Sequence, residues 1–264
     1  MNKQFKSVDI LGVRIDVLNM DQAVKRIEEW IEAGKGKYYV VTPNPEFIMA
    51  AQRDEEFRKI LNNADMAVPD STRLGWASKV FGERNWLKKI LLGPLFLFPS
   101  KQLIQFDTVP GVDLMKELCR VASEKSFTVG FLGGSDGVAK KTAECLIKRY
   151  PKLKVGFADD GGVVDNEGNV LSSMYYGKKE EIDILFVAFG QVKQEKWIAK
   201  NLNLIPVKVA MGVGGSFDEI SGKVPRIPDW IYHLGFKWLA RLVIQPWRIK
   251  RQTALVKFVW NVLK

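Results

Sequence analysis

Runs of consecutive apolar and β-branched residues alternate along the chain with segments whose apolar residues recur at helical spacing. The runs predict strands at residues 37–43, 65–70, 127–134, 153–159, 183–190 and 207–215. The helical spacing predicts helices at 45–64, 111–125 and 136–150, the last capped by Ser135 or Asp136. Near-continuous apolar strands are typical of parallel sheets that are buried on both faces. The pattern therefore predicts an α/β fold with a Rossmann-like, mostly parallel sheet and helices on both faces.

Residues 83–106 depart from this alternation, because they are both apolar and basic, with a net charge of +3. Their most apolar run, Leu91–Phe98, contains Gly93-Pro94 and is too short to cross a bilayer. Three interpretations are open: a buried loop, a subunit contact in a homo-oligomer, or a hydrophobic lip that dips into lipid.

The C-terminal residues 230–264 form the second departure. They hold seven Lys or Arg and no Asp or Glu, which is +7 of the formal net charge of +10, and four of the eight Trp. Residues 1–229 are nearly balanced, with 33 basic and 30 acidic side chains. Interleaved cations, indoles and aliphatic residues suit a membrane surface better than a specific nucleic acid. We therefore predict an α/β domain at 1–229 and a helical, membrane-associating appendage at 230–264.

The remaining composition narrows the class of protein. The N-terminus lacks the apolar core of a signal peptide, and no run of eighteen apolar residues exists. Cys119 and Cys145 lack metal-ligand spacing and suit a reducing compartment. No DxD motif is present, and nothing around Asp159-Asp160 completes a cation site, so no required metal is predicted. We expect a cytoplasmic protein attached peripherally to the inner face of the cell membrane.

Short polar motifs follow the first two predicted strands. Thr42 and Asn44 stand in Thr-Pro-Asn-Pro, where Asn44 either faces a ligand or caps the next helix, with Pro45 at its first position. Asp70 ends Val-Pro-Asp and is a candidate general base or, equally, a helix cap. Because ligands of parallel sheets bind beyond the carboxyl ends of the strands, both motifs are candidate site residues.

Glycine-rich turns follow two other strands. The turn with Gly133, Gly134 and Gly137 leads into a helix, where backbone amides would suit a nucleotide diphosphate. Its GGxxG spacing differs from the dinucleotide fingerprint, and a tight structural turn is the alternative. Gly214 lies in a second turn, which either allows a close approach of substrate or is only crowded.

Further polar candidates lie on helices. Gln194 and Glu195 begin a helix at a strand's carboxyl end, where a sugar would lie; a merely charged first turn is the alternative. Arg241, Arg248 and Arg251 are spaced by seven and three residues, so one helical face would carry all three. Arginine suits bidentate contact with a diphosphate, although a solvated or lipid-facing basic stripe explains the pattern as well.

Taken together, these segments resemble the WecG/TagA/CpsF family of bacterial glycosyltransferases. The resemblance rests on eight segments in order: 42–46, 62–71, 111–114, 131–139, 150–155, 186–198, 212–230 and 235–251. It implies transfer of a sugar, N-acetylmannosamine or a related hexose derivative, from a UDP-sugar to a polyprenyl-diphosphate-linked acceptor such as N-acetylglucosamine. The polymer served would be a cell-surface polysaccharide or teichoic acid.

The resemblance also assigns roles by position. Asp70 matches the family's proposed base, Thr42 and Asn44 a substrate-pocket pair, and Gln194 a sugar-proximal glutamine. The three arginines of 230–264 match those of an appendage that closes the site. The family often has Arg-Val-x-Gly where this chain has Thr108-Val-Pro-Gly. A positive contact to substrate is then missing or supplied elsewhere, for example by Arg73 or Arg84.

The resulting hypothesis is an inverting, metal-independent glycosyltransferase in which Asp70 deprotonates an acceptor hydroxyl. The glycine turns and the arginines would offset charge on the departing UDP. Two rivals remain: a nucleotide-dependent oxidoreductase that uses Gly133–Gly137, with Asp159 or Asp160 on a ribose, and a non-catalytic peripheral membrane adaptor.

Overall fold

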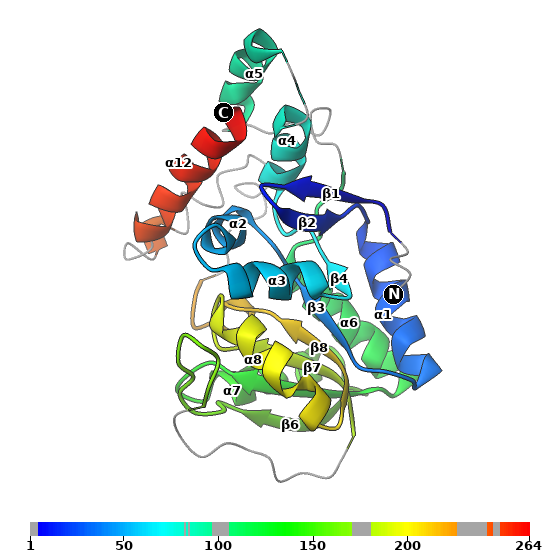
Figure 1. Ribbon diagram of the computed structural model, residues 1–264. Coiled ribbons are helices and arrows are strands. Elements are labelled where there is room, and N and C mark those ends of the chain that lie inside the picture. Colours follow the sequence, from blue (N-terminus) through cyan, green and yellow to red (C-terminus); the bar gives the residue numbers. More distant parts are fainter. Residues whose placement is uncertain are drawn as a thin grey trace.

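The protein is built around a six-stranded, fully parallel sheet, seen in a computed structural model that describes residues 5–81, 83, 85–96, 106–170, 181–225, 242–244 and 249–264 (Figure 1). The strand order is β4-β3-β8-β7-β5-β6. The strands span Tyr38–Val41 (β3), Met66–Ala67 (β4), Thr128–Gly133 (β5), Lys154–Asp159 (β6), Ile182–Ala188 (β7) and Val207–Gly212 (β8). The predicted fold class is therefore confirmed, and each of the six predicted strands is present.

Helices cover both faces of this sheet. One face packs against α1 (Met20–Ala33), α6 (Gly111–Lys125), α7 (Val138–Arg149) and α9 (Ser216–Ile220). The other packs against α8 (Lys193–Asn201), α2 (Pro45–Ala51), α3 (Glu55–Asn63) and α4 (Thr72–Phe81). Short 3-10 turns are η1 (Gly93–Phe96) and η3 (Leu202–Leu204). Because both faces are covered, β5, β7 and β8 are largely apolar, as the sequence predicts.

Two local predictions were wrong. The single helix expected at 45–64 is two helices, because Asp54 leaves helical geometry and its side chain accepts a hydrogen bond from Phe57 N to begin α3. The N-cap of α7 is Gly137, not Ser135 or Asp136. The carboxylate that binds the Gly137 amide comes from Asp160, at the end of the neighbouring strand β6. A side chain outside the helix thus replaces the expected local cap.

A two-stranded antiparallel hairpin, β1 (Ser7–Ile10) and β2 (Val13–Asp16), precedes the sheet and was not predicted. It packs against α3 and α4 through Ile10, Val13 and Ile15, all fully buried. The hairpin thereby extends the apolar core on the side of the sheet that carries β4.

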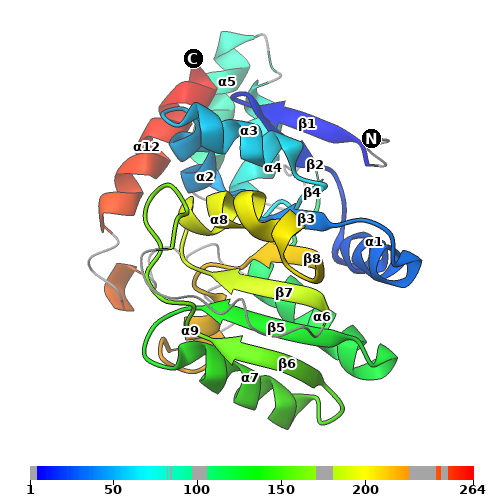
Figure 2. The same ribbon diagram turned by 60° about the horizontal axis from the view of Figure 1, so that its bottom comes forward.

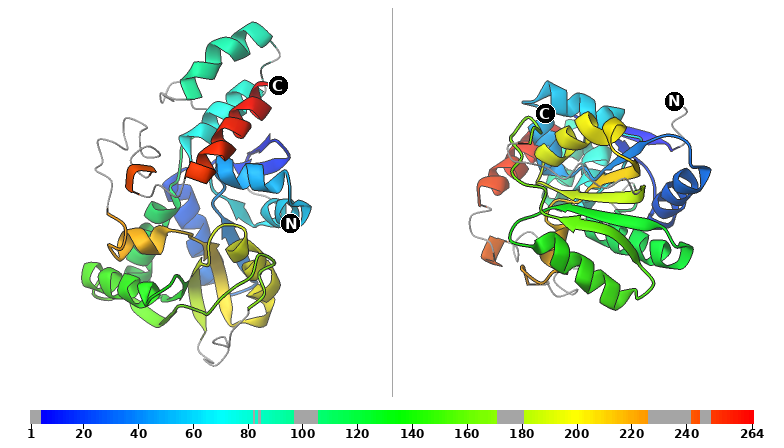
Figure 3. Two further views of the ribbon diagram at one scale, coloured as in Figure 1. Left: turned by 90° about the vertical axis from the view of Figure 1, so that its left-hand side faces the viewer. Right: turned by 90° about the horizontal axis from the view of Figure 1, so that it is seen from below.

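The chain ends in α12 (Ile249–Leu263), which packs on α2 and α4 beneath the projecting helix α5 (Trp86–Leu92) (Figure 3). Phe258 and Val262 of α12 are fully buried in the same core as Trp76 of α4. No helix in the described part of the chain is long and apolar enough to span a membrane. The predicted boundary between 229 and 230 falls outside the described residues and stays a prediction.

Candidate active site

The predicted site residues gather at one edge of the sheet, where the parallel strands end. Asp70 follows β4, Thr42 follows β3, Gly212 ends β8, and Gln194 follows β7. Figure 2 shows β6 and β7 pointing toward the side of the molecule on which α12 lies. Since adjacent strands lie about 4.8 Å apart, the ends of β4 and β8, with β3 between them, lie about 10 Å apart, a span that a hexose can bridge.

The carboxylate of Asp70 is fixed by a helix that begins 41 residues later. Its Oδ1 accepts a 2.7 Å hydrogen bond from the backbone N–H of Gly111, the first residue of α6. The N-cap residue of α6, Pro110, supplies no side-chain cap, so Asp70 performs that function from another element. Asp70 is half-buried at this edge, so the residue that caps α6 is not sealed in the interior.

Thr42 lies beside this pair. A Cβ added to Gly111 would lie 3.4 Å from Cγ2 of Thr42, so the threonine side chain packs directly over the start of α6. On its other side, the Thr42 hydroxyl donates a long, 3.5 Å hydrogen bond to the carbonyl of Gly212 in β8. Thr42 therefore connects the Asp70 end of the site with the Gly212 end.

Asn44 caps α2, as one of its two sequence interpretations predicts. Its Oδ1 accepts hydrogen bonds from the N–H groups of Glu46 (2.9 Å) and Phe47 (3.1 Å), and Pro45 occupies the first helical position. The amide Nδ2 of this half-buried side chain has no acceptor among the described residues. Capping and substrate contact are thus compatible for Asn44, since they use different atoms.

Gln194 is buried and clamps the last glycine turn. Its Nε2 donates to Oε1 of Glu195 (2.6 Å), and its Oε1 accepts from the N–H of Gly214 (3.0 Å). A Cβ on Gly212 would lie 2.7 Å from Nε2 of Gln194, so any larger residue there would force the buried amide to shift. The structure places Gln194 against the turn that holds Gly214; its contact with a sugar stays a prediction.

Glu195 is the support behind Gln194, and sequence reasoning missed that role. Its side chain is fully buried, and its Oε2 accepts 2.8 Å from the N–H of Val192. Val192 has φ 74° and ψ −54°, a strained conformation for a β-branched residue. Burial raises the pKa of the Glu195 carboxyl to about 7, against the hydrogen bonds from Gln194 and Val192, which lower it. Glu195 is a charged residue at the start of a helix, and the local sequence gives no indication that its side chain is buried.

The turn after β5 is tightly packed and already hydrogen bonded. The N–H of Gly134 donates to the Ala188 carbonyl (3.0 Å), and the N–H of Gly137 donates to Asp160 (2.8 Å). Gly133 has φ 104°, and an added Cβ would lie 2.7 Å from the Ala188 carbonyl carbon. These N–H groups can donate to a diphosphate only if their present protein acceptors move, so the tight-turn interpretation explains their geometry directly.

Thr108, which stands where the family often has arginine, lies near Asp70, and so does Arg73, three residues after Asp70 in the chain. Thr108 is half-buried and precedes Val109, whose N–H donates to the Pro69 carbonyl (2.8 Å). Arg73 lies in the first turn of α4, with its guanidinium 5.1 Å from the ring centroid of Phe96. Arg84, Arg241 and Arg248 lie outside the described residues, as does the side chain of Arg251 in α12.

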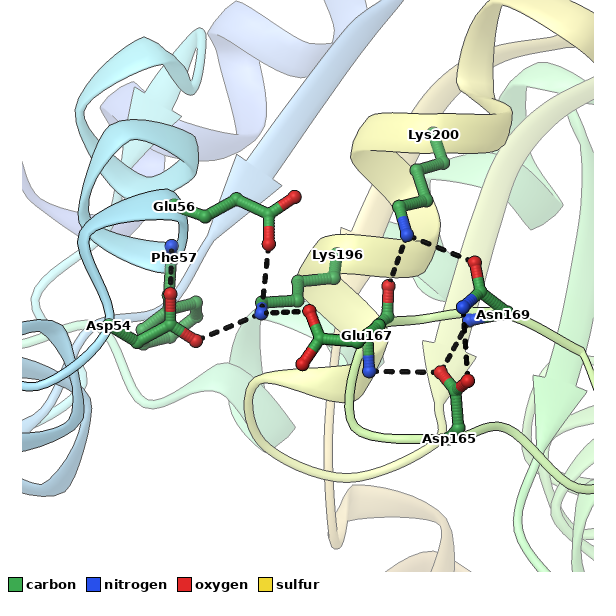
Figure 4. A network of polar contacts seen from close by, with 8 residues as sticks. All are labelled: Asp54, Glu56, Phe57, Asp165, Glu167, Asn169, Lys196 and Lys200. Carbon is green, nitrogen blue, oxygen red and sulfur yellow. Dashed lines mark hydrogen bonds and ion pairs between the residues drawn. The ribbon is translucent and has the colours of Figure 1, made fainter.

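A buried lysine locks α8 to the neighbouring elements (Figure 4). Lys196 forms 2.9 Å ion pairs with Asp54 and Glu56 around the start of α3 and with Glu167 in the loop after β6. Burial alone would lower the pKa of Lys196, but the three carboxylates together raise it above its ordinary value. This network is structural: it fixes the helix that carries Gln194 and Glu195. Among the described residues no group of three His, Cys, Asp or Glu could hold a metal ion.

A six-stranded parallel sheet with a fixed carboxylate and glycine turns at its carboxyl edge defines an α/β enzyme site. The chain belongs to the glycosyl transferase WecG/TagA/CpsF family, which it matches over residues 8–90 and 98–264. It is 30% identical to an N-acetylglucosaminyldiphosphoundecaprenol N-acetyl-beta-D-mannosaminyltransferase of Bacillus subtilis (strain 168) over 85% of this chain and 78% of the relative. It is equally similar, at 30%, to a protein of the same name from Staphylococcus aureus (strain MRSA252), over 97% of this chain and 92% of the relative. The predicted family and the predicted class, a glycosyltransferase, are confirmed.

Proposed function

We propose that the protein transfers N-acetylmannosamine from a UDP-sugar to N-acetylglucosamine on a polyprenyl diphosphate, in the synthesis of teichoic acid or another cell-surface polymer. The names of the relatives support the sugar and the acceptor. The observation that carries the proposal is the Asp70 carboxylate, held by Gly111 at the sheet edge beside Thr42. Membership of the family argues against the oxidoreductase and adaptor hypotheses.

In this mechanism Asp70 accepts the proton of an acceptor hydroxyl as that oxygen attacks the anomeric carbon of the donor. The bond from that carbon to the UDP oxygen breaks, and UDP leaves with the electron pair. A single displacement on an α-linked donor gives a β-linked product, which fits the beta-D-mannosaminyl group in the relatives' names. The hydrogen bond from Gly111 orients the carboxylate before substrate arrives, which is how a positioned base gains its rate advantage.

Other side chains of the protein suit the binding of the sugar and the departure of UDP. The hydrogen bond from the Gly214 N–H to Gln194 fixes the turn after β8, beside which the sugar would lie. Arg241, Arg248 and Arg251, assigned by resemblance, would offset charge on the departing diphosphate without a metal ion. A polyprenyl acceptor stays in the bilayer, so the enzyme must work at the membrane surface.

A surface on α5 and α12 supports peripheral attachment to the membrane. Leu87 of α5 is exposed, and so are Val256 and Trp260 of α12, at 71% and 64%. Lys88 and Lys257 are exposed on the same two helices. Exposed apolar and aromatic side chains with interspersed lysines suit an anionic interface, at about 1 kcal/mol per basic residue.

The test is a donor screen. Purified protein is incubated with a short-chain polyprenyl diphosphate N-acetylglucosamine and a panel of UDP-sugars, and the products are read by mass spectrometry. We expect one added N-acetylhexosamine with UDP-N-acetylmannosamine, in the presence of a chelator. Transfer of a different sugar would overturn the donor assignment, and loss of activity on chelation would overturn the metal-independent mechanism.

A further inference from the structure

Arg73 of α4 carries a half-buried guanidinium. Its Nε is sealed from solvent and has no hydrogen-bond acceptor, and no ion pair to the side chain is found among the described residues. Burial lowers the pKa of Arg73 to about 10, so the group stays charged at neutral pH. Phe96 provides an aromatic face but no counter-charge. A half-buried cation without an acid is costly to a fold, so a ligand is the natural source of the missing charge.

The position of Arg73 adds to this excess of positive charge. It lies in the first turn of α4, where the helix dipole is positive and acidic side chains are favoured, yet that turn contains none. Ser71 Oγ accepts a 3.3 Å hydrogen bond from the Arg73 N–H and supplies only a neutral cap. Two independent sources of positive potential therefore coincide at the start of α4.

Arg73 lies between a polar and an apolar part of the structure. On one side, three residues earlier in the chain, lies Asp70 with its bond to Gly111. On the other, Phe96 packs edge-on against Trp76 with ring centroids 5.1 Å apart, and the Trp76 indole N–H donates to the Leu92 carbonyl at the end of α5. This apolar side is part of the core that α4 shares with α12, and Leu92 and Leu263, which pack against that core, are only partly buried.

We infer that Arg73 binds the diphosphate of the lipid-linked acceptor, a contact that rests on the proposed function. An acceptor of this class has a sugar, a diphosphate and a prenyl chain in that order. The chain offers a base, a guanidinium and the partly buried leucines at the margin of an apolar core, in the same order. Arginine is well suited to the bidentate contact that a diphosphate accepts. The diphosphate of the donor carries polar uridine instead, so it does not explain an apolar wall directly beside the cation.

Steady-state kinetics test this assignment with Arg73→Gln, Arg73→Lys and the matched control Lys79→Gln, which removes an exposed cation from the same helix. Arg73→Gln should raise KM for the acceptor about tenfold, as loss of one charge-assisted contact predicts, and leave KM for the UDP-sugar within about twofold. Arg73→Lys should restore part of the loss, and Lys79→Gln should behave as wild type. A selective rise in KM for the donor would overturn the inference.

Two further measurements separate this inference from folding and from the proposed function. Because none of the acids in the described part of the chain pairs with Arg73, Arg73→Gln should melt at the wild-type temperature or above it; a marked fall in Tm would indicate a structural role and contradict the inference. Calorimetric titration with farnesyl diphosphate needs no turnover, so it decides the question even if no sugar is transferred. Weaker binding of farnesyl diphosphate by Arg73→Gln, with UDP binding unchanged, supports it. No binding by wild type, no change in the variant, or an equal loss of both ligands overturns it.

Discussion

The backbone N–H of Gly111 donates a 2.7 Å hydrogen bond to Oδ1 of Asp70. This contact joins the end of β4 to the start of α6 across 41 residues of sequence. It gives one carboxylate two functions, because the oxygen that caps α6 also fixes the orientation of the group proposed to accept a proton. The two functions predict different responses to substitution.

The capping function predicts that Asp70→Asn is as stable as wild type and that Asp70→Ala is not. Asparagine keeps an Oδ1 acceptor for Gly111, whereas alanine leaves the N–H unpaired and should cost about 1 kcal/mol of unfolding free energy. Urea unfolding followed by circular dichroism measures the difference. Asp113→Asn, on the exposed side of the first turn of α6, is the control and should change little. Equal stability of the Asn and Ala variants would show that Asp70 does not stabilise α6 as a cap.

Glu195 predicts a specific pH dependence of stability. Its pKa is raised from 4.5 to about 7 in the folded protein, so the folded state binds the proton more tightly than the unfolded state. The stabilisation that proton binding at Glu195 adds to the unfolding free energy is therefore fully present below about pH 4.5. It is lost as the pH rises through about 7, by about 3 kcal/mol in total. Glu195→Gln lacks this titration. The difference in unfolding free energy between Glu195→Gln and wild type should shift in favour of the variant over that window. A difference that is constant with pH would show that Glu195 is not the titrating group.

The Lys196 network predicts a loss of stability that a surface pair does not show. Lys196→Met removes the cation shared by Asp54, Glu56 and Glu167 and leaves three carboxylates facing one another. Because those carboxylates are partly exposed, we expect a cost of about 1–3 kcal/mol, less than for a fully buried pair. Lys59→Met, which breaks an exposed pair with Glu55, should cost less than about 0.5 kcal/mol. Chemical denaturation of both variants checks this; similar losses would contradict it.

The surface on α5 and α12 predicts membrane binding that depends on particular apolar side chains. Trp260→Ala combined with Val256→Ser should reduce sedimentation with anionic liposomes several-fold, because both side chains would lose their contact with the interface. Leu204→Ala is the control, since Leu204 is equally exposed but lies in η3, outside the proposed surface. Equal loss in the control, or none in the double variant, would argue against this surface.

The sequence predicted the sheet because each buried strand is a short apolar run bounded by turn residues, as in 127–134 and 183–190. The sequence also contains a signal for the break between α2 and α3. Asp54 followed by two glutamates is typical of a helix start, and it lies inside the predicted helix 45–64. The hairpin at Ser7–Asp16 was missed because its strands, SVDI and VRID, contain charged residues and form no apolar run.

The candidate site was also predicted only in part. Asp70, Thr42, Asn44 and Gln194 were found because each follows a predicted strand, and parallel strands end at one edge. The contacts that support these residues were not predicted, because each contact depends on a partner far away in the sequence. Gly111 reaches Asp70 only once α6 has packed, and the acids around Lys196 come from α3 and from the loop after β6. No local pattern indicates that a charged residue such as Glu195 is buried.

The most direct test of the account is the single-turnover rate of Asp70→Asn with UDP-N-acetylmannosamine and a short-chain polyprenyl diphosphate N-acetylglucosamine. A lost general base predicts a rate lower by about 10²–10⁴-fold, with donor binding and unfolding free energy as in wild type. A variant that transfers the sugar at the wild-type rate would show that Asp70 is only the cap of α6, and the proposed mechanism would fail.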